Sequence, residues 1–262
     1  MPNTVLSTQA GRIDNAYCLA LMAKSVYFDD PIANYPLFSA SCKRVLLISG
    51  NRIQASLAVE SEHIVLAFRG SDTDKEWIEA LVFGQIELEV GLAHKGLYSA
   101  LDAIWKPILA ALYDAGADQR TLWLTGHSLG GALATIAAQR LDAEGFEPHM
   151  VCTFGAPPVL DAEAAEAFRV PLYRFVNSED IVPHILWTSP FKRYAHPGEE
   201  VFLVPSGRMA APRYSRRLAR RIDRAHTIGE IHASGPIHDH AMENYIEKLR
   251  RLLEDSPHAP AS

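Results

Sequence analysis

A short apolar run in the middle of the chain leads directly into a serine with glycines on both sides. Residues 120–131 read Arg-Thr-Leu-Trp-Leu-Thr-Gly-His-Ser-Leu-Gly-Gly, and small apolar residues follow at helical spacing. A serine held at a tight strand-to-helix turn has a strained backbone, and the positions two residues before and after it need the small volume of glycine. The pattern predicts a strand, a sharp turn at Ser128, and a helix whose positive N-terminus lies near the serine hydroxyl. The alternative is a glycine-rich turn in which Ser128 caps the helix.

Strands and helices are predicted to alternate along the rest of the chain. Apolar runs predict strands at 44–49, 53–59, 63–68, 121–125, 150–154, 172–176 and 201–204. Helical spacing predicts helices at 14–28, 96–115, 128–144, 161–168 and 240–254. Pro107 predicts a kink or a break in the second of these helices. The alternation is typical of an α/β fold with a mostly parallel central sheet and helices on both faces, and the turn at Gly50-Asn51 predicts an antiparallel edge.

The chain has 262 residues and no linker rich in Gly, Ser or Pro. We therefore expect a single domain over residues 1–262, with a disordered tail at 256–262.

A serine nucleophile needs a histidine to take its proton and a carboxylate to orient that histidine. On a doubly wound sheet the three residues follow in the chain order serine, acid, histidine. Asp180 lies at the carboxyl end of the second strand after Ser128 and precedes an apolar Ile-Val-Pro stretch that would bury it. Glu179 is the alternative acid. Asp161 is predicted instead to cap the helix at 161–168.

The histidine and the oxyanion donors are less sharply defined by the residues alone. His238 and His240 both precede the last amphipathic helix, where a triad histidine usually lies, and the sequence does not choose between them. The backbone N–H of Leu129, directly after the serine, is one expected donor to the oxyanion of a tetrahedral intermediate. Ser71, in the loop after an earlier strand, is the second, and its alternative role is to cap a helix at 73–82.

Several motifs in the same chain order resemble the class 3 lipases, which are related to the filamentous-fungal triacylglycerol lipases. The resemblance implies an α/β-hydrolase fold with Ser128 as nucleophile, Asp180 as triad acid and His240 as base. It also implies Ser71 and Leu129 as oxyanion donors. The motifs are Phe68-Arg69-Gly70-Ser71, Trp77-Ile78, His94-Lys95-Gly96, Gly126-His127-Ser128-Leu129-Gly130-Gly131, Thr153-Phe154-Gly155-Ala156-Pro157 and Arg174-Phe175-Val176-Asn177-Ser178-Glu179-Asp180-Ile181-Val182-Pro183.

In such lipases a short helix after the oxyanion serine acts as a lid, and residues 72–83 fit that role. Trp77, Ile78, Leu81 and Val82 form one apolar stripe in this segment, while its other positions are largely polar. The resemblance implies a flap that covers an acyl-binding groove in water and opens at a lipid surface. An ordinary amphipathic helix would carry the same stripe.

Charge and cysteine content exclude several other classes. The formal net charge of −6 argues against a general nucleic-acid-binding protein, and the three cysteines lack metal-ligand spacing, so we expect neither a metal nor another cofactor. No apolar run approaches the length of a membrane span. The first residues have no basic segment followed by an apolar stretch, so no signal peptide is visible and a cytoplasmic protein is expected.

Seven arginines gather between residues 208 and 224 of this otherwise acidic chain. They surround a narrow apolar line, as in a solvated helix with a thin core contact, which is the preferred interpretation. A basic amphipathic helix on an anionic membrane or lipid-droplet surface is the alternative. The arginines are Arg208, Arg213, Arg216, Arg217, Arg220, Arg221 and Arg224.

The sequence as a whole favours a serine hydrolase that cleaves carboxylic esters of acyl lipids through an acyl-enzyme, like a triacylglycerol lipase. Within the same chemistry, the alternatives are a small-ester carboxylesterase and a phospholipase A1-type enzyme. Outside enzymes, the alternative is a catalytically silent hydrolase fold that binds or scaffolds.

Overall fold

The computed structural model describes residues 13–28, 44–50, 53–70, 84–178, 180–184, 194–204, 209–210 and 239–255, together with residues 6, 8 and 42. Several sequence predictions lie outside these residues. They are Ser71, the candidate lid at 72–83, Glu179, the arginines at 208–224, His238 and the tail at 256–262.

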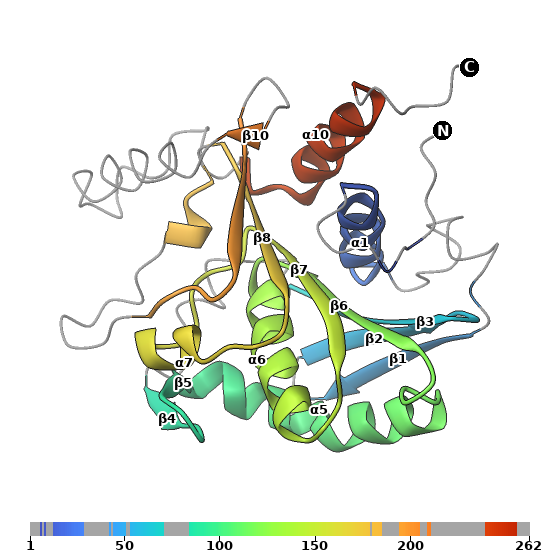
Figure 1. The fold of residues 1–262 in the computed structure, drawn as a ribbon, viewed down its shortest axis with the longest axis vertical. Coiled ribbons are helices and arrows are strands. Elements are labelled where there is room, and N and C mark those ends of the chain that lie inside the picture. Colours follow the sequence, from blue (N-terminus) through green and yellow to red (C-terminus); the bar gives the residue numbers. More distant parts are fainter. Residues whose placement is uncertain are drawn as a thin grey trace.

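One eight-stranded sheet forms the centre of the described molecule (Figure 1), and a separate two-stranded hairpin lies beside it. The order of strands across the large sheet is β1-β2-β3-β6-β7-β8-β9-β10. Its strands are β1 Arg44–Gly50, β2 Ile53–Val59, β3 His63–Phe68, β6 Thr121–His127, β7 Pro148–Phe154, β8 Leu172–Asn177, β9 Glu199–Leu203 and β10 Met209–Ala210. The hairpin consists of β4 Gln85–Glu87 and β5 Leu92–His94.

The direction of the strands follows the prediction of a mostly parallel sheet with an antiparallel edge. β3, β6, β7, β8 and β9 are parallel neighbours, whereas β1, β2 and β3 pair antiparallel at one edge. All six residues of β3 are buried, as expected for a strand covered on both faces. β4, β5 and β10 were not predicted from the sequence, because two or three residues carry too little periodicity to be recognised.

Helices cover both faces of the sheet (Figure 1). One face packs against α5 Lys95–Asp114 and α6 Leu129–Ala143 through the larger apolar cluster. The opposite face packs against α1 Ile13–Ser25 and α10 Met242–Glu254, which lie side by side. The helix at 161–168 is shorter than predicted, α7 Ala162–Glu166, and the 3-10 helix Val182–His184 follows Asp180.

Two local predictions about helices have different outcomes. Asp161 caps α7, because its carboxylate accepts a hydrogen bond from the Ala164 N–H at 2.9 Å. Pro107 was predicted to cause a kink or a break, and the break is wrong, since α5 continues past it to Asp114. The apolar side chains of α5, including the buried Ile104 and Ile108 on either side of Pro107, pack against the sheet and stabilise the helix despite the missing hydrogen bond.

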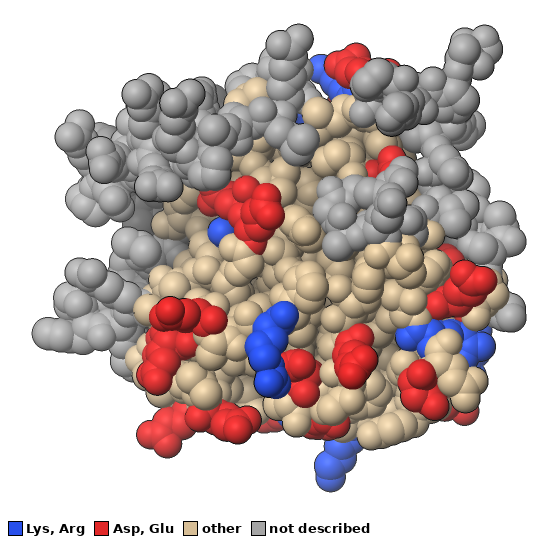
Figure 2. Space-filling model, viewed as in Figure 1, with Lys and Arg blue, Asp and Glu red and all other residues tan. Residues whose placement is uncertain are grey.

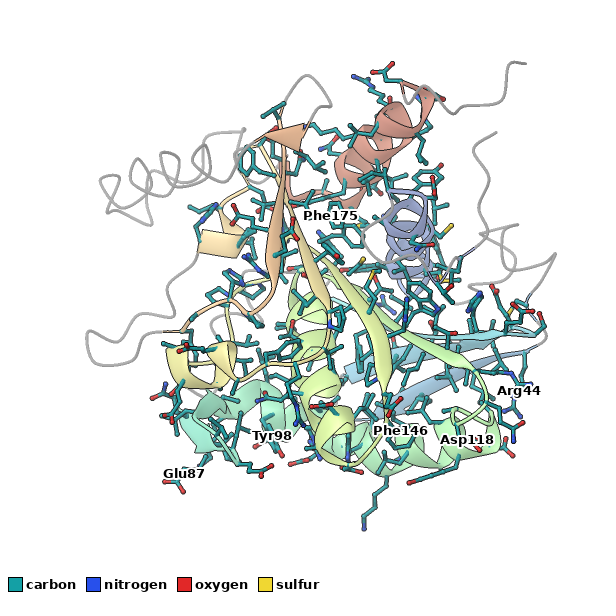
Figure 3. The ribbon with its side chains drawn as sticks, in the orientation of Figure 1. Arg44, Glu87, Tyr98, Asp118, Phe146 and Phe175 are labelled. Carbon is teal, nitrogen blue, oxygen red and sulfur yellow. The ribbon has the colours of Figure 1, made fainter. Side chains whose placement is uncertain are left out.

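Many charged side chains lie at the periphery, and several aromatic side chains lie in the interior. Figure 2 shows acidic side chains around β4, α5 and α7 on one face of the molecule. Figure 3 shows Arg44, Glu87 and Asp118 at the outside, whereas Phe175 of β8 points into the layer between the sheet and α10. The Phe175 ring stacks on that of Phe154 with a centroid distance of 5.3 Å.

Among the described helices, none combines the length and apolar character needed to cross a bilayer. The described residues also contain no cluster of His, Cys, Asp and Glu side chains arranged to hold a metal ion. The described sheet carries an apolar cluster on each face, and the single domain over 1–262 stays a prediction.

Candidate active site

Ser128 occupies the sharp turn between β6 and α6. Its backbone has φ 55° and ψ −126°, a conformation that costs a non-glycine residue of order 1–3 kcal/mol and is held only by its surroundings. The Ser128 N–H donates to the Phe154 carbonyl at 2.8 Å, which ties the turn to the end of β7. Ser128 makes no side-chain capping bond to α6. The alternative of a helix-capping serine is therefore wrong.

The glycines beside Ser128 are required by close backbone packing. A Cβ atom on Gly126 would lie 2.3 Å from the carbonyl carbon of Gly130, inside any normal contact distance. A Cβ atom on Gly130 would lie 2.2 Å from the Phe68 carbonyl oxygen and 2.9 Å from the Arg69 carbonyl carbon. The turn thus packs directly on the segment that leads from β3 towards position 71.

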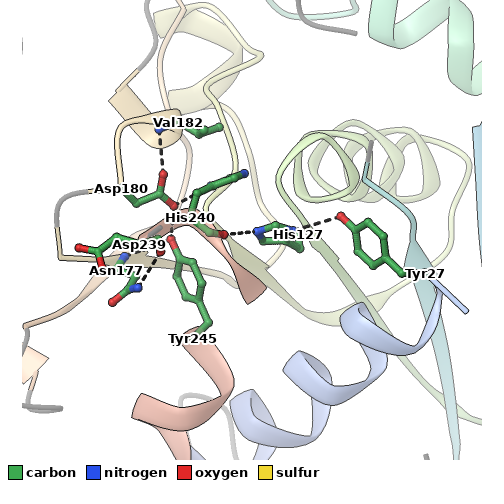
Figure 4. Close-up of polar contacts among 8 residues, drawn as sticks. All are labelled: Tyr27, His127, Asn177, Asp180, Val182, Asp239, His240 and Tyr245. Atoms are coloured by element: carbon green, nitrogen blue, oxygen red, sulfur yellow. Dashed lines mark hydrogen bonds and ion pairs between the residues drawn. The ribbon is translucent and has the colours of Figure 1, made fainter. Parts of the chain in front are cut away.

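Asp180 follows β8 and is fully buried, with 0% of its surface exposed. A buried carboxylate is stable only when hydrogen bonds replace its water, and three donors do so here (Figure 4). The Val182 N–H reaches Oδ1 at 2.9 Å, while His240 Nδ1 at 2.9 Å and the Tyr245 hydroxyl at 2.5 Å both reach Oδ2. Asp180 is therefore positioned to orient the imidazole of His240.

His240 is buried, and its bond to Asp180 defines its tautomer. Because a carboxylate oxygen accepts a hydrogen bond, Nδ1 carries the proton that lies between the two side chains. In the neutral ring Nε2 then carries the lone pair, which is the form that a general base requires. The pairing selects His240 as the partner of Asp180 within the described segment at 239–255.

The serine turn and the Asp180–His240 pair lie at the same edge of the sheet, beyond the carboxyl ends of β6, β7 and β8. Phe154, which binds the Ser128 N–H, is followed by Gly155 at φ 60°. A Cβ atom on Gly155 would lie 2.7 Å from Asp180 Oδ2 and 2.9 Å from His240 Nδ1, so this backbone packs against the pair. The backbone of Ser128 and the Asp180–His240 pair therefore lie against two consecutive residues, Phe154 at the end of β7 and Gly155 directly after it.

A second set of polar side chains holds the Asp180 loop and the His240 segment together. Asn177, the last residue of β8, donates its N–H to the Tyr245 hydroxyl at 3.1 Å and its amide Nδ2 to the Asp239 carbonyl at 2.7 Å. Lys248 Nζ donates to Asn177 Oδ1 at 2.5 Å. Burial and the nearby Asp180 raise the pKa of Tyr245 well above 10, so its hydroxyl stays protonated and can donate.

His196 supports the loop from the other side. Its Nε2–H donates to the Pro183 carbonyl at 2.7 Å, three residues beyond Asp180. Burial, followed by the positive charge of Arg174, lowers the pKa of His196 to about 3. The ring is therefore neutral at neutral pH.

Of the predicted site residues, Ser128, Leu129, Asp180 and His240 meet at this edge. Ser71 and the lid residues Trp77, Ile78, Leu81 and Val82 lie outside the described residues, so their roles stay predictions. The sequence did not assign roles to six further side chains that contact the site or its loop. These are Tyr27, His127, Asn177, His196, Tyr245 and Lys248.

The sequence and the fold have counterparts among known proteins. Residues 65–189 match the family described as lipase (class 3). A lipase from Caenorhabditis elegans is 31% identical over 170 residues, which cover 59% of this chain and 47% of the relative. A secreted mono- and diacylglycerol lipase from Fusarium solani is 35% identical over 132 residues, which cover 47% of this chain and 39% of the relative. The chain thus spans less than half of the length of each of these relatives.

Solved lipase structures share the fold. The crystal structure of a lipase from Rhizopus microsporus var. chinensis superimposes with a TM-score of 0.64 at 21% sequence identity and covers 78% of each chain. The predicted α/β-hydrolase fold, with its mostly parallel sheet and antiparallel edge, is confirmed.

The predicted cytoplasmic localisation is wrong, because the relative from Fusarium solani is named as a secreted enzyme. That prediction relied on the first residues of a chain that matches less than half of its relatives' length, and such residues carry no information about a leader segment.

Proposed function

We propose that this protein is a serine hydrolase that cleaves carboxylic esters of acyl lipids, because residues 65–189 match the family described as lipase (class 3). Ser128 is the nucleophile, His240 the base and Asp180 the residue that orients the base. One observation carries the proposal: a serine at positive φ and a buried imidazole–carboxylate pair lie beyond the carboxyl ends of adjacent parallel strands. Ligands of open α/β sheets bind at this edge.

The reaction proceeds in two halves on the same serine. His240 Nε2 takes the proton of the Ser128 hydroxyl as Oγ attacks the ester carbonyl carbon. The tetrahedral adduct then collapses, its bond to the alcohol oxygen breaks, and the leaving alcohol takes the proton from His240. A water molecule next gives a proton to the same nitrogen as its oxygen attacks the acyl carbon. The bond between that carbon and Ser128 Oγ then breaks, Oγ takes the proton back from His240, and the fatty acid is released. Asp180 stabilises the imidazolium that forms in each half.

The negative oxygen of the tetrahedral adduct needs donors that are already in place. Leu129 is the first residue of α6, so its N–H has no acceptor within the helix and is available at the helix end. Ser71 is the proposed second donor. The packing of Gly130 against Phe68 and Arg69 supports this role, because it brings the chain leading to position 71 close to the serine turn.

We propose acylglycerols as substrates, in keeping with the name of the Fusarium solani relative. The proposed lid at 72–83 would open at a lipid surface, with Trp77, Ile78, Leu81 and Val82 turned towards the lipid. Phospholipids and small soluble esters have the same scissile bond and are the competing substrates.

The nucleophile is tested with a fluorophosphonate probe, which labels activated serines. We expect the wild-type protein and Ser99→Ala, which changes an exposed serine of α5, to be labelled and to hydrolyse p-nitrophenyl butyrate. Ser128→Ala should not be labelled and should lose at least about 10³-fold in kcat/KM. Hydrolysis by Ser128→Ala at the wild-type rate would refute the mechanism, and an unlabelled, inactive wild-type protein would favour a silent binding fold.

The substrate class is tested with a panel of esters above and below the concentration at which they form an interface. Acylglycerol emulsions should be hydrolysed faster per labelled serine than soluble butyrate esters of the same concentration. Faster turnover of phosphatidylcholine vesicles would indicate a phospholipase instead. Hydrolysis of soluble short-chain esters without any increase in rate when the ester forms an interface would indicate a carboxylesterase.

A further inference from the structure

The ring of His127 joins the serine turn to the backbone of the proposed base. His127 is the residue before Ser128, and its Nε2 lies 2.7 Å from the carbonyl oxygen of His240 (Figure 4). The two imidazole rings face each other with a centroid distance of 4.6 Å. His240 is thus held at two places: its Nδ1 by Asp180 from the end of β8, and its carbonyl by His127 from the end of β6.

The hydrogen bonds of His127 define its tautomer. A carbonyl oxygen only accepts, so Nε2 carries a proton. Burial, together with the neighbouring His240, lowers the pKa of His127 well below 6.5, so the ring is neutral and its Nδ1 carries no proton. Nδ1 lies 3.1 Å from the Tyr27 hydroxyl, which therefore donates to it. The chain of donors runs in one direction, from Tyr27 through His127 to the carbonyl of His240.

Tyr27 is itself closely fitted between two segments of the site. It follows the end of α1, and its hydroxyl would lie 2.1 Å from a Cβ atom on Gly70. The same Cβ atom would lie 2.8 Å from the His127 carbonyl oxygen. Glycine at position 70 therefore leaves the space in which the Tyr27 hydroxyl reaches His127.

We propose that His127 is a positioning residue for the base of this hydrolase, and that Tyr27 fixes the tautomer in which His127 donates to the His240 carbonyl. The inference rests on the proposed function. The carbonyl bond fixes the main chain of His240, and the bond to Asp180 fixes the rotation of its ring. Loss of the carbonyl bond should displace Nε2 from the serine and slow chemistry, while leaving substrate binding unchanged.

Two substitutions separate the donor of His127 from the rest of its ring. Glutamine places an amide N–H at the same number of bonds from the backbone as His127 Nε2, whereas leucine fills the space without a donor. We expect His127→Leu to lower kcat by about 10- to 100-fold with KM changed by less than about twofold, as for a base displaced by a fraction of an ångström. His127→Gln should stay within about threefold of wild type because the donor is retained.

Tyr27→Phe tests the second half of the proposal. In the wild-type background, it should lower kcat by about three- to tenfold, because His127 Nδ1 loses its partner and the ring is less firmly held. In the His127→Gln background it should change kcat by less than about twofold, since the glutamine amide has no acceptor at the Nδ1 position. Equal effects of Tyr27→Phe in the two backgrounds would overturn the proposed chain of donors.

All rates are measured with a soluble p-nitrophenyl ester. They are divided by the amount of serine that a fluorophosphonate labels, so that unfolded protein does not lower the calculated kcat. The matched control is His63→Gln, which changes a buried histidine at the amino end of β3, where its Nδ1 accepts from Trp123 Nε1 at 3.3 Å. It should lower the melting temperature and leave kcat per labelled serine unchanged.

Four outcomes decide the proposal. Rescue by glutamine but not by leucine supports it, and equal losses with both substitutions overturn it. Wild-type kcat in His127→Leu also overturns it. If His127→Leu yields no folded protein, the coupling between Tyr27→Phe and His127→Gln decides alone. A wild-type protein without labelling or hydrolysis would be a failure of the proposed function, which this set of variants distinguishes from failure of the positioning role.

Discussion

Replacing Tyr245 by phenylalanine removes a single oxygen atom from the centre of the polar network behind the site. The Tyr245 hydroxyl donates to Asp180 Oδ2 and accepts from the Asn177 N–H, and Tyr245 is fully buried. No water replaces the oxygen in a side chain packed this closely. Tyr245→Phe therefore leaves a buried carboxylate with one donor fewer and a buried amide without its acceptor.

The magnitude follows from these two losses. A hydrogen bond to a charged group contributes about 1.5–3 kcal/mol, and leaving a buried N–H unsatisfied costs about 1–3 kcal/mol. We therefore expect Tyr245→Phe to lower the free energy of unfolding by about 3–5 kcal/mol, with little relief from the slightly more apolar ring. This is a large part of the about 5–15 kcal/mol by which native proteins are stable.

The assay is denaturation by urea, followed by tryptophan fluorescence at pH 7. Tyr113→Phe is the matched control, because 70% of Tyr113 is exposed, and it should change the free energy of unfolding by less than about 0.5 kcal/mol. If Tyr245→Phe lowers the free energy of unfolding by less than about 1 kcal/mol, the reasoning is refuted, because Asp180 and Asn177 would then have found other hydrogen-bond partners at no cost in stability.

Two further predictions concern the backbone and the pH dependence of stability. Gly130→Ala places a Cβ atom 2.2 Å from the Phe68 carbonyl oxygen, so we expect the free energy of unfolding to fall by about 1–3 kcal/mol. The displaced serine turn should also no longer be labelled by the fluorophosphonate, and labelling at the wild-type rate would contradict the predicted displacement. His196 has its pKa lowered to about 3 in the folded protein, so the unfolded chain binds its proton first, and stability falls as the pH decreases from about 6.5 towards 3. His196→Gln should flatten this decrease in thermal melts between pH 7 and 4, and an unchanged pH dependence of the melting temperature would show that other groups control it.

The parts of the site that were predictable are those that depend on residues close together in the sequence. Ser128 and its glycines form one local pattern, and the structure bears out the strain and the close packing that the pattern indicates. Asp180 was predictable from its place after a parallel strand, because parallel strands end at one edge of the sheet.

The parts that were missed depend on contacts between distant segments. His238 and His240 are two residues apart, and the choice between them depends on how the 239–255 segment meets β8, sixty residues earlier. The hydrogen bond from Tyr27 to His127 joins residues that are 100 positions apart, so no local sequence pattern could predict it. Asn177 follows the predicted strand at 172–176 and was given no role, whereas in the structure its N–H, its amide nitrogen and its amide oxygen each bind a partner in the last helix or in the turn before it.

The packing of α1 against α10 has a consequence for any shortened form of this protein. Residues 65–189, which match the family, hold the proposed nucleophile and acid but not the proposed base, nor Tyr27, which follows the end of α1, nor Tyr245 of α10. Cutting the chain to the recognisable family segment would remove the whole layer that covers one face of β6 and β7 and would expose its apolar cluster to water. A shortened form that is expected to fold and to hydrolyse esters therefore has to retain both α1 and α10.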